Sequence, residues 1–286
     1  MHSLNGKFRV LGFIGILLLT VGCGVSFIQP GPTETQEETV ELAGAERVNV
    51  EIQPALQELT LTGGAAALFA GTFSYNLDAL APTVNYTVQN GVGELVIGSA
   101  GERVNTIPIG QVVSEWDLQF NDAVPLALDL NLGLGNSDIN LRDLNLTALE
   151  IEAGAGRVQV DVGQQELDRL RFDAGLGEVD VSLGGGRLDT LDFNAGAGNV
   201  TIDLTGDWQS DLAARINGAL GEITLILPTA VGVRIEVDQG LGTINAVGLQ
   251  SEADNVYVND AYGTTAVTLE IAIEQAAGNV NLRVVK

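Results

Sequence analysis

A glycine that returns at a nearly constant interval is the feature that most constrains how this chain folds. The steps between its copies are 21, 21, 21, 23 and 21 residues, and the positions are Gly135, Gly156, Gly177, Gly198, Gly221 and Gly242. Most copies close a Gly-x-Gly frame, and an earlier frame ends at Gly93, two periods before Gly135. Self-similarity with a period of about 20–50 residues is typical of stacked architectures. Most of the chain is therefore predicted to be a scaffold of equivalent coils.

Apolar residues alternate on both sides of each repeating glycine. The positions around Gly156 are Leu149, Ile151, Ala153 and Ala155 before it and Val158, Val160 and Val162 after it. Period-two alternation predicts half-buried strands, and the slip in phase at the glycine predicts a bend. Later repeats follow the same pattern, which assigns Leu176, Ala197 and Leu241 to the core together with Ala155. Each coil is expected to read strand, glycine bend, strand and connector, with Leu146, Leu167, Leu188 and Trp208 as buried connector residues.

The predicted fold is all-β, a β-solenoid of about 21-residue coils over residues 124–286. A more irregular β segment, residues 41–123, precedes it, and within that segment residues 48–62 alternate like the later coils. A β-sandwich is the alternative, because short strands with regular turns also suggest one. The constant step favours the solenoid. Aromatic residues make up only 5% of the chain, which suits thin layers stacked about 4.8 Å apart.

The charge balance limits the partners of this chain. It has 13 basic and 37 acidic residues, a formal net charge of −24. An acidic surface argues against nucleic acid or anionic lipid as a direct ligand and permits cationic partners and divalent metals. Solubility alone is the simplest explanation of the charge. The single histidine is His2 and the single cysteine is Cys23, so residues 24–286 contain no imidazole or thiol for catalysis or zinc binding.

The amino-terminal sequence is predicted to be a targeting signal. Basic residues precede the apolar run Val10–Val21, and Gly22-Cys23 follows, as at the end of a bacterial lipoprotein signal. Residues 1–22 are then a signal peptide, and Cys23 is the lipidated residue that anchors the chain in the membrane. A retained transmembrane helix over Val10–Ile28 is the alternative. Either arrangement places the domain outside the cytoplasmic membrane, and residues 23–40 are expected to be a flexible tether.

Several spaced motifs resemble a known family. They are Phe69-x-Gly71-x-Phe73, Pro82, Glu115-Trp116-Asp117-Leu118, Val124-Pro125-Leu126 and the Gly-x-Gly strands that follow. Together they resemble the toast-rack family, a domain of unknown function related to the LiaF-like proteins of the cell-wall antibiotic response. The resemblance covers about residues 40–286. It implies a β-helical repeat domain in the bacterial cell envelope, with a role in envelope stress, and it carries no catalytic residues. The chain lacks the multi-span membrane region of the LiaF-like proteins.

Stacked coils would align outward-facing residues into columns. One column holds no basic residue: Asn131, Glu152, Asp173, Asn194, Asn217 and Asp238. Its neighbour mixes signs: Asp129, Glu150, Arg171, Asp192, Arg215 and Glu236. Carboxylate and amide oxygens suit Ca²⁺, so Glu152 and Asp173 are candidate metal ligands. A solvated face without a metal is the simpler alternative.

Two classes of function are open. A polysaccharide lyase would use acidic Ca²⁺ ligands and a base such as Arg157, Arg171, Arg187 or Arg215. A calcium-binding adhesin would use the same acidic face. The uniform repeats, with no long loop to wall a cleft, favour instead a non-enzymatic scaffold that binds an envelope partner. The only long irregular insertion is Leu249–Thr265, whose Tyr257 and Tyr262 either contact a partner or form a structural cap.

Overall fold

The computed structural model describes residues 26–101 and 106–285, and over these residues the protein is built almost entirely of strands. The only helical turn assigned among them is the short 3₁₀ segment η1 (Asp78–Leu80). None of the helical structure in this part of the chain is long and apolar enough to span a bilayer. The predicted signal peptide, residues 1–22, and the predicted lipidation site Cys23 lie outside the described residues.

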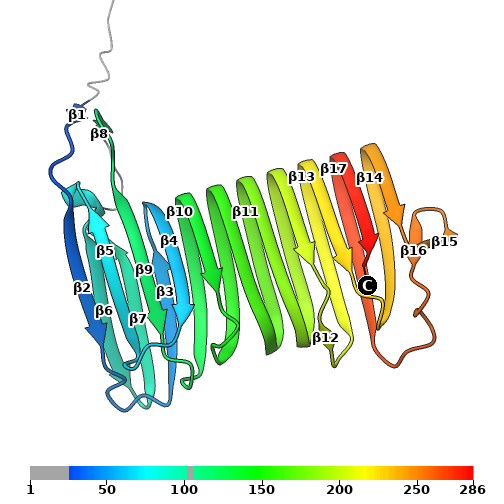
Figure 1. Ribbon diagram of the computed structural model, residues 1–286, viewed down its shortest axis with the longest axis horizontal. Helices are drawn as coiled ribbons and strands as arrows, with labels where there is room; N and C mark the ends of the chain where they lie inside the picture. The colour runs from blue at the N-terminus through cyan, green and yellow to red at the C-terminus, as the bar shows by residue number, and fades with distance from the viewer. Residues whose placement is uncertain (1–25, 102–105, 286) are drawn as a thin grey trace, which may run out of the picture.

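Five long strands form the coils of a rod (Figure 1). They are β10 (Leu126–Asn140), β11 (Leu146–Asp203), β13 (Leu212–Leu227), β14 (Gly232–Val247) and β17 (Thr268–Val284), with the short β12 (Asp207–Trp208) beside β11. Neighbouring coils pair in parallel and in register, so that Gly135 lies beside Gly156 and Gly198 beside Gly221. The predicted β-solenoid is confirmed, and its alternative, the β-sandwich, is not what forms.

The repeating glycines stack directly on one another. From Gly135 to Gly278 they adopt φ between 125° and 147°, a region that side-chain-bearing residues rarely occupy. A Cβ atom at Gly156 would overlap the carbonyl oxygen of Gly135, and one at Gly177 would overlap that of Gly156. The 21-residue period therefore records a steric requirement of the stack as well as a bend in each coil.

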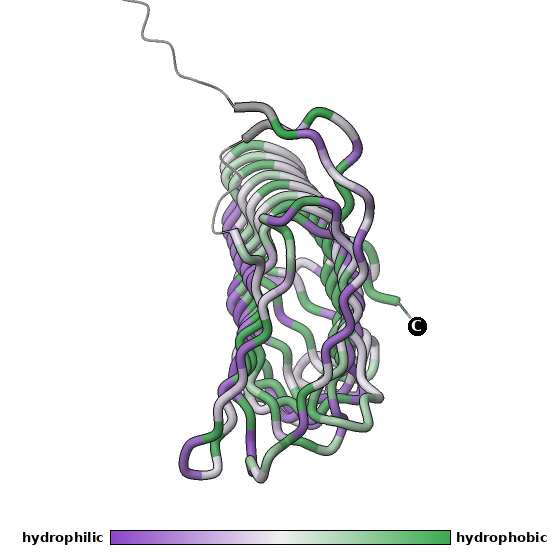
Figure 2. Tube along the Cα trace, turned by 90° about the vertical axis from the view of Figure 1, so that its left-hand side faces the viewer, coloured by the Kyte–Doolittle hydropathy of each residue, from purple (hydrophilic) through white to green (hydrophobic). Residues whose placement is uncertain are grey.

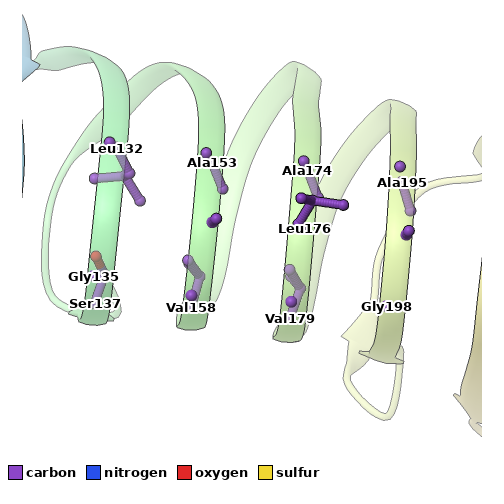
Figure 3. Close-up of a pocket in the computed structure, with 18 of the residues that line it drawn as sticks. Leu132, Gly135, Ser137, Ala153, Val158, Ala174, Leu176, Val179, Ala195 and Gly198 are labelled. Atoms are coloured by element: carbon purple, nitrogen blue, oxygen red, sulfur yellow. The ribbon is translucent and has the colours of Figure 1, made fainter.

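The interior of the rod is a continuous apolar column. Val158, Val179 and Val200 are 4–5% exposed and face Leu132, Ala153, Ala174 and Ala195 across the narrow end of the coil (Figure 3). Only about 20 Å³ of empty space remains between these residues. The predicted connector residues Leu146, Leu167, Leu188 and Trp208 are buried as well.

One expectation about the bends is wrong. Leu176 and Leu241, expected in the core, are 62% and 74% exposed, and Ala155 and Ala197 are only half-buried. The slip in phase starts one residue before the repeating glycine, so the residue inside each Gly-x-Gly frame points outward from the bend.

The solenoid continues into the N-terminal segment. The strands β3 (Arg47–Gln53) and β4 (Leu56–Gly63) together form a coil against β10, with Leu126 beside Val48 and Ser137 beside Leu59. The strands β7 (Val92–Ser99) and β9 (Ser114–Phe120) extend the two faces in parallel. The antiparallel strands β2 (Glu34–Val40), β5 (Phe69–Tyr75) and β6 (Pro82–Gln89) close this end, and β1 (Ser26–Ile28) pairs with β8 (Thr106–Pro108).

The packing at this closed end explains the Phe69-x-Gly71-x-Phe73 motif. The Phe69 ring centroid lies 5.2 Å from that of Phe120, and the Phe73 ring meets Trp116 edge-on at 5.1 Å. A Cβ atom on Gly71 would come within 2.6–2.9 Å of both phenylalanine rings, so glycine leaves the space that the rings occupy. Both phenylalanines are fully buried.

Gly93 is not an earlier copy of the coil bend. It lies inside β7, paired with Val48 of β3, and the nearby turn is the hairpin between β6 and β7 at Asn90-Gly91, with φ of 52° and 79°. The spacing of two periods is therefore coincidental. The first coil, β3 and β4, has Gln57 where the later coils have the repeating glycine.

The predicted tether, residues 23–40, is wrong over its second half. Residues Glu34–Val40 form β2, which pairs antiparallel with β5 along its whole length. Backbone hydrogen bonds to β5 do not depend on side-chain polarity. An edge strand can therefore carry the acidic, threonine-rich composition that suggested an extended linker.

The stacking order at the C-terminal end differs from the order in the sequence. The last strand β17 lies between β13 and β14, so Gly278 separates Gly221 from Gly242. The insertion Leu249–Thr265 supplies β15 (Gln250–Ala253) and β16 (Val256–Val258), and β16 pairs antiparallel with the outer edge of β14. Tyr257 lies beside Ile235 in that pairing. The insertion is thus the structural cap rather than a free loop.

Replacing Val179 with aspartate tests the interior column. An unpaired carboxylate would be buried among valines, and a loss of about 3–5 kcal/mol in the free energy of unfolding is expected. Urea unfolding of Val179→Asp measures it. The control is Gln159→Asp, on the exposed side of the preceding coil, which should change stability by about 0.5 kcal/mol or less. Equal effects from the two substitutions would contradict the assigned core.

Replacing Gly177 with alanine tests the glycine stack. Gly263 also has positive φ, 74°, but a Cβ atom there has no neighbour within 4 Å. The Gly263→Ala change should therefore cost only the backbone strain, about 1–2 kcal/mol. The Gly177→Ala change adds overlap with the backbone of the preceding coil at Gly156 and should cost clearly more in a thermal unfolding experiment. A smaller loss at Gly177 than at Gly263 would show that the stack tolerates a side chain.

Candidate functional site: a polar ladder on the outer face

Parallel in-register pairing aligns the outward residues of the first half of each coil. The amide–carboxylate column is Asn131, Glu152, Asp173, Asn194, Asn217, Glu274 and Asp238. Beside it runs the charge column, Asp129, Glu150, Arg171, Asp192, Arg215, Ala272 and Glu236. Sequence reasoning found both columns but missed Glu274 and Ala272, because β17 enters the stack out of sequence order. We call the two columns together the polar ladder.

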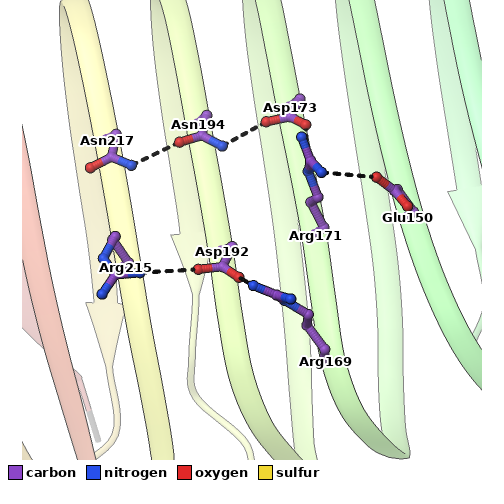
Figure 4. Close-up of polar contacts among 8 residues, drawn as sticks. All are labelled: Glu150, Arg169, Arg171, Asp173, Asp192, Asn194, Arg215 and Asn217. Atoms are coloured by element: carbon purple, nitrogen blue, oxygen red, sulfur yellow. Dashed lines mark hydrogen bonds and ion pairs between the residues drawn. The ribbon is translucent and has the colours of Figure 1, made fainter.

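Hydrogen bonds run along the amide–carboxylate column (Figure 4). Asn217 donates its amide to Asn194 at 2.8 Å, and Asn194 donates to Asp173 at 2.6 Å. Identical amides at the coil spacing can form such a chain because each has a donor and an acceptor. The carboxylate of Asp173 ends the chain.

The charge column is held by ion pairs. Arg171 donates its Nε–H to Asp173 at 2.7 Å and approaches Glu150 at 3.4 Å. Asp192 lies between two cations, accepting a hydrogen bond from the Nε–H of Arg169 at 2.7 Å and pairing with Arg215 at 3.7 Å. Opposite charges on adjacent strands stabilise a sheet, and all of these contacts except Arg171–Asp173 cross from coil to coil.

The candidate metal ligands do come together. Carboxylate oxygens of Glu150, Glu152 and Asp173 lie within 4.8 Å of one another, so sequence reasoning missed only Glu150 of this group. However, Arg171 already contacts two of the three carboxylates. The hydrogen bond that Arg171 donates to Asp173, with the charges of Asp173, Glu150 and Glu152, raises the pKa of Arg171 above its ordinary value. The guanidinium group of Arg171 therefore already pairs with the carboxylates that would bind a cation.

The four arginines considered as lyase bases are all engaged with carboxylates. Arg157 pairs with Glu178, and Arg187 lies 3.5 Å from Asp189. Arg171 and Arg215 belong to the polar ladder. For Arg171 the hydrogen bond to Asp173 raises the pKa of the guanidinium, which is unfavourable for proton abstraction.

A shallow groove of about 450 Å³ lies where the N-terminal segment meets the first long coils. Its floor is lowered by the small side chains of Ala127 and Ala148. Around that floor stand Asn49, Glu51, Glu94, Asp129, Glu150, Arg169 and Arg171. The groove thus borders the polar ladder, and it combines side chains of both charges with apolar surface such as the exposed Val96.

A solenoid of in-register parallel coils with a polar outer face is the class of protein that this geometry defines. The family model of the N-terminal domain of toast_rack, DUF2154, matches residues 29–182 and 167–226. The matched residues are more than half of the chain, and the protein belongs to the toast-rack family.

Comparison with other proteins adds distant structural similarities. A candidate cell adhesion protein from Clostridium sporogenes is 23% identical, with a TM-score of 0.48, over 89% of this chain and 100% of that one. A candidate adhesin from Bacteroides fragilis is 11% identical, with a TM-score of 0.41, over 89% and 99% of the two chains. A candidate lipid binding protein from Parabacteroides distasonis is 14% identical, with a TM-score of 0.41, over 90% and 100%. No curated protein matches the chain. Similarities this distant carry no inference about ligands.

Removing Arg171 tests whether it occupies the place of a cation. The Arg171→Ala variant keeps the three carboxylates and removes the guanidinium that contacts two of them, so its affinity for Ca²⁺ should rise several-fold over that of the unaltered protein. Isothermal titration calorimetry measures the change. The control Arg187→Ala removes an equally exposed arginine from another ion pair and should leave Ca²⁺ binding unchanged. Equal titrations of the two variants would exclude a site at Glu150, Glu152 and Asp173.

Proposed function

We propose that the protein is a membrane-tethered, extracytoplasmic scaffold that presents a repeated binding surface in the bacterial cell envelope. The polar ladder carries this proposal, because it offers the same outward columns over seven successive coils. Such a surface suits a partner that makes many similar contacts along a line. Membership of the toast-rack family extends the proposal to a role in envelope stress.

The amino-terminal sequence supports the location. A basic start, the apolar run Val10–Val21 and Gly22-Cys23 fit removal of residues 1–22 and lipidation of Cys23. The rival anchor, a retained transmembrane segment over Val10–Ile28, would leave the domain on the same side of the membrane. Since β2 is part of the fold, the tether between anchor and domain is shorter than the sequence alone suggests.

The chemistry of the chain supports a role without catalysis. Residues 24–286 contain no histidine or cysteine. The arginines of the polar ladder are paired with carboxylates, and most of the apolar side chains lie in the core. General acid–base catalysis at neutral pH needs a group whose pKa is tuned toward that range. The proposal therefore assigns binding rather than turnover.

A calcium-dependent adhesin or a polysaccharide-binding protein is the second candidate. The observation in its favour is the groove beside Ala127 and Ala148, which shares Glu150 with the cluster of three carboxylates. A groove that combines both charges with apolar surface could hold a sugar polymer along the ladder. The ion pairs of Arg171 disfavour the metal-dependent form of this candidate.

Mass spectrometry of the membrane fraction tests the anchor. The protein should begin at Cys23 and carry acyl chains, and the Cys23→Ser variant should lose that modification and retain residues 1–22. A free thiol on Cys23 with Met1 still attached would establish the transmembrane anchor instead.

Site-specific photo-cross-linking in intact cells tests the binding surface. A photoreactive amino acid at Asn194 or Asn217 should yield the same envelope adduct, whereas Thr224, on the outer face of the other half of the coil, serves as the matched control. Adducts that do not differ among the three positions would contradict a role for the polar ladder. Cleavage of a polysaccharide by the purified protein, abolished in a Glu152→Gln, Asp173→Asn double variant, would overturn the non-enzymatic assignment.

A further inference from the structure

The glycine bends carry a row of exposed leucines. Leu134, Leu176, Leu220 and Leu241 are 54%, 62%, 59% and 74% exposed. In the stack they alternate with alanines, in the order Leu134, Ala155, Leu176, Ala197, Leu220, Ala277 and Leu241. The alternation survives the rearranged end of the chain, because Ala277 of β17 falls between Leu220 and Leu241. We call this row the leucine ridge.

The leucine ridge is continuous and uncharged. Its seven positions span six coil spacings of about 4.8 Å, roughly 29 Å in all. On one side it borders the column Gly133, Gly154, Gly175 and Gly196, which carries no side chains. Scattered surface leucines need no explanation, but an apolar row in which leucines alternate with alanines marks an interaction surface.

The two edges of the rod differ in character. Figure 1 shows the continuous strands curving over at the upper edge, while the loops between strands lie along the lower edge. The lower loops expose polar residues such as Arg142, Asp143, Thr205 and Thr229. Viewed along the stack, the upper bend shows recurring apolar colour (Figure 2). The ridge therefore makes one edge apolar and leaves the other polar.

The chain enters the fold at the apolar edge. The first described strand β1 and its partner β8 project at the upper edge (Figures 1 and 2). Ile28 and Ile109 there are 39% and 62% exposed, and the backbone N–H of Ile109 donates to the carbonyl of Ile28 at 2.8 Å. With the ridge, this edge holds six of the eight exposed large apolar residues of the described segments. The preceding 25 residues include the apolar run Val10–Val21.

We propose that the leucine ridge rests on the surface of the lipid bilayer to which the chain is anchored. This inference rests on the proposed membrane tether. An anchor that leaves from the same edge keeps the ridge at high effective concentration near the lipid, so individually weak leucine contacts suffice. The rod then lies along the membrane with its polar ladder turned to the side.

The surrounding charges select the kind of surface. The amide–carboxylate column, three residues before each ridge position, carries Glu152, Asp173, Glu274 and Asp238. These carboxylates disfavour anionic headgroups and are compatible with zwitterionic ones. They also disfavour a second copy of this chain on the ridge, because two such columns would be brought together with the same sign of charge.

Quenching of tryptophan by brominated lipid tests the contact. Protein purified from membranes is reconstituted into phosphatidylcholine vesicles whose acyl chains carry bromine. The Leu176→Trp and Leu220→Trp variants should lose fluorescence, and the matched control Thr229→Trp, on the lower edge, should not. The native tryptophans Trp116 and Trp208 are buried, 2% and 4% exposed, and give the same background in every variant.

Flotation of the same vesicles separates the two levels of the proposal. Protein that floats while both ridge tryptophans stay as unquenched as Thr229→Trp would overturn the ridge contact and leave the tether standing. Protein that does not float would overturn both. A disulfide between copies of a Leu176→Cys variant on vesicles, with the ridge tryptophans of the other variants unquenched, would assign the ridge to a second copy and also overturn the inference.

Discussion

The close approach of backbone to backbone at the repeating glycines is the constraint on which the rest of the structure depends. At Gly156 and Gly177 the carbonyl oxygen of one coil occupies the space of a Cβ atom on the next. This contact fixes the register, and the register in turn places Val179 in the core and Asp173 on the outer face. A shift by one residue would exchange the two faces of every strand. The polar ladder and the leucine ridge both depend on this register, because the glycine contacts keep neighbouring coils from shifting along one another.

The sequence was enough to predict the coil, its period and most of its core, because these depend on local alternation and a steric marker that recurs. It misplaced Leu176 and Leu241, since period-two counting cannot say at which residue of a bend the phase slips. It assigned β2 to a tether because an edge strand held by backbone hydrogen bonds leaves little trace in side-chain composition. Its Gly93 copy was an accident of spacing, which only the pairing of β7 with β3 resolves.

The candidate site was predictable to the same degree. Columns of outward-facing residues follow from the period, so the sequence alone groups Glu152, Asp173, Asn194 and Asn217. The reach of Arg171 across to Glu150 and Asp173 could not, because a long side chain chooses among several carboxylates at similar distance. The place of Glu274 could not be predicted for another reason, since its neighbours depend on where β17 enters the stack.

That last strand has a consequence for how the molecule assembles. A solenoid can ordinarily grow coil by coil as the chain is made, each new coil settling on the one before it. Here β14 is synthesised before β17 yet ends up outside it, two strand spacings from β13, because β17 pairs with both. If β14 stacked directly on β13, the 17-residue strand β17 could not lie between them. The end of the rod therefore closes only after β17 has been made, because this strand has to lie between two coils that were made earlier.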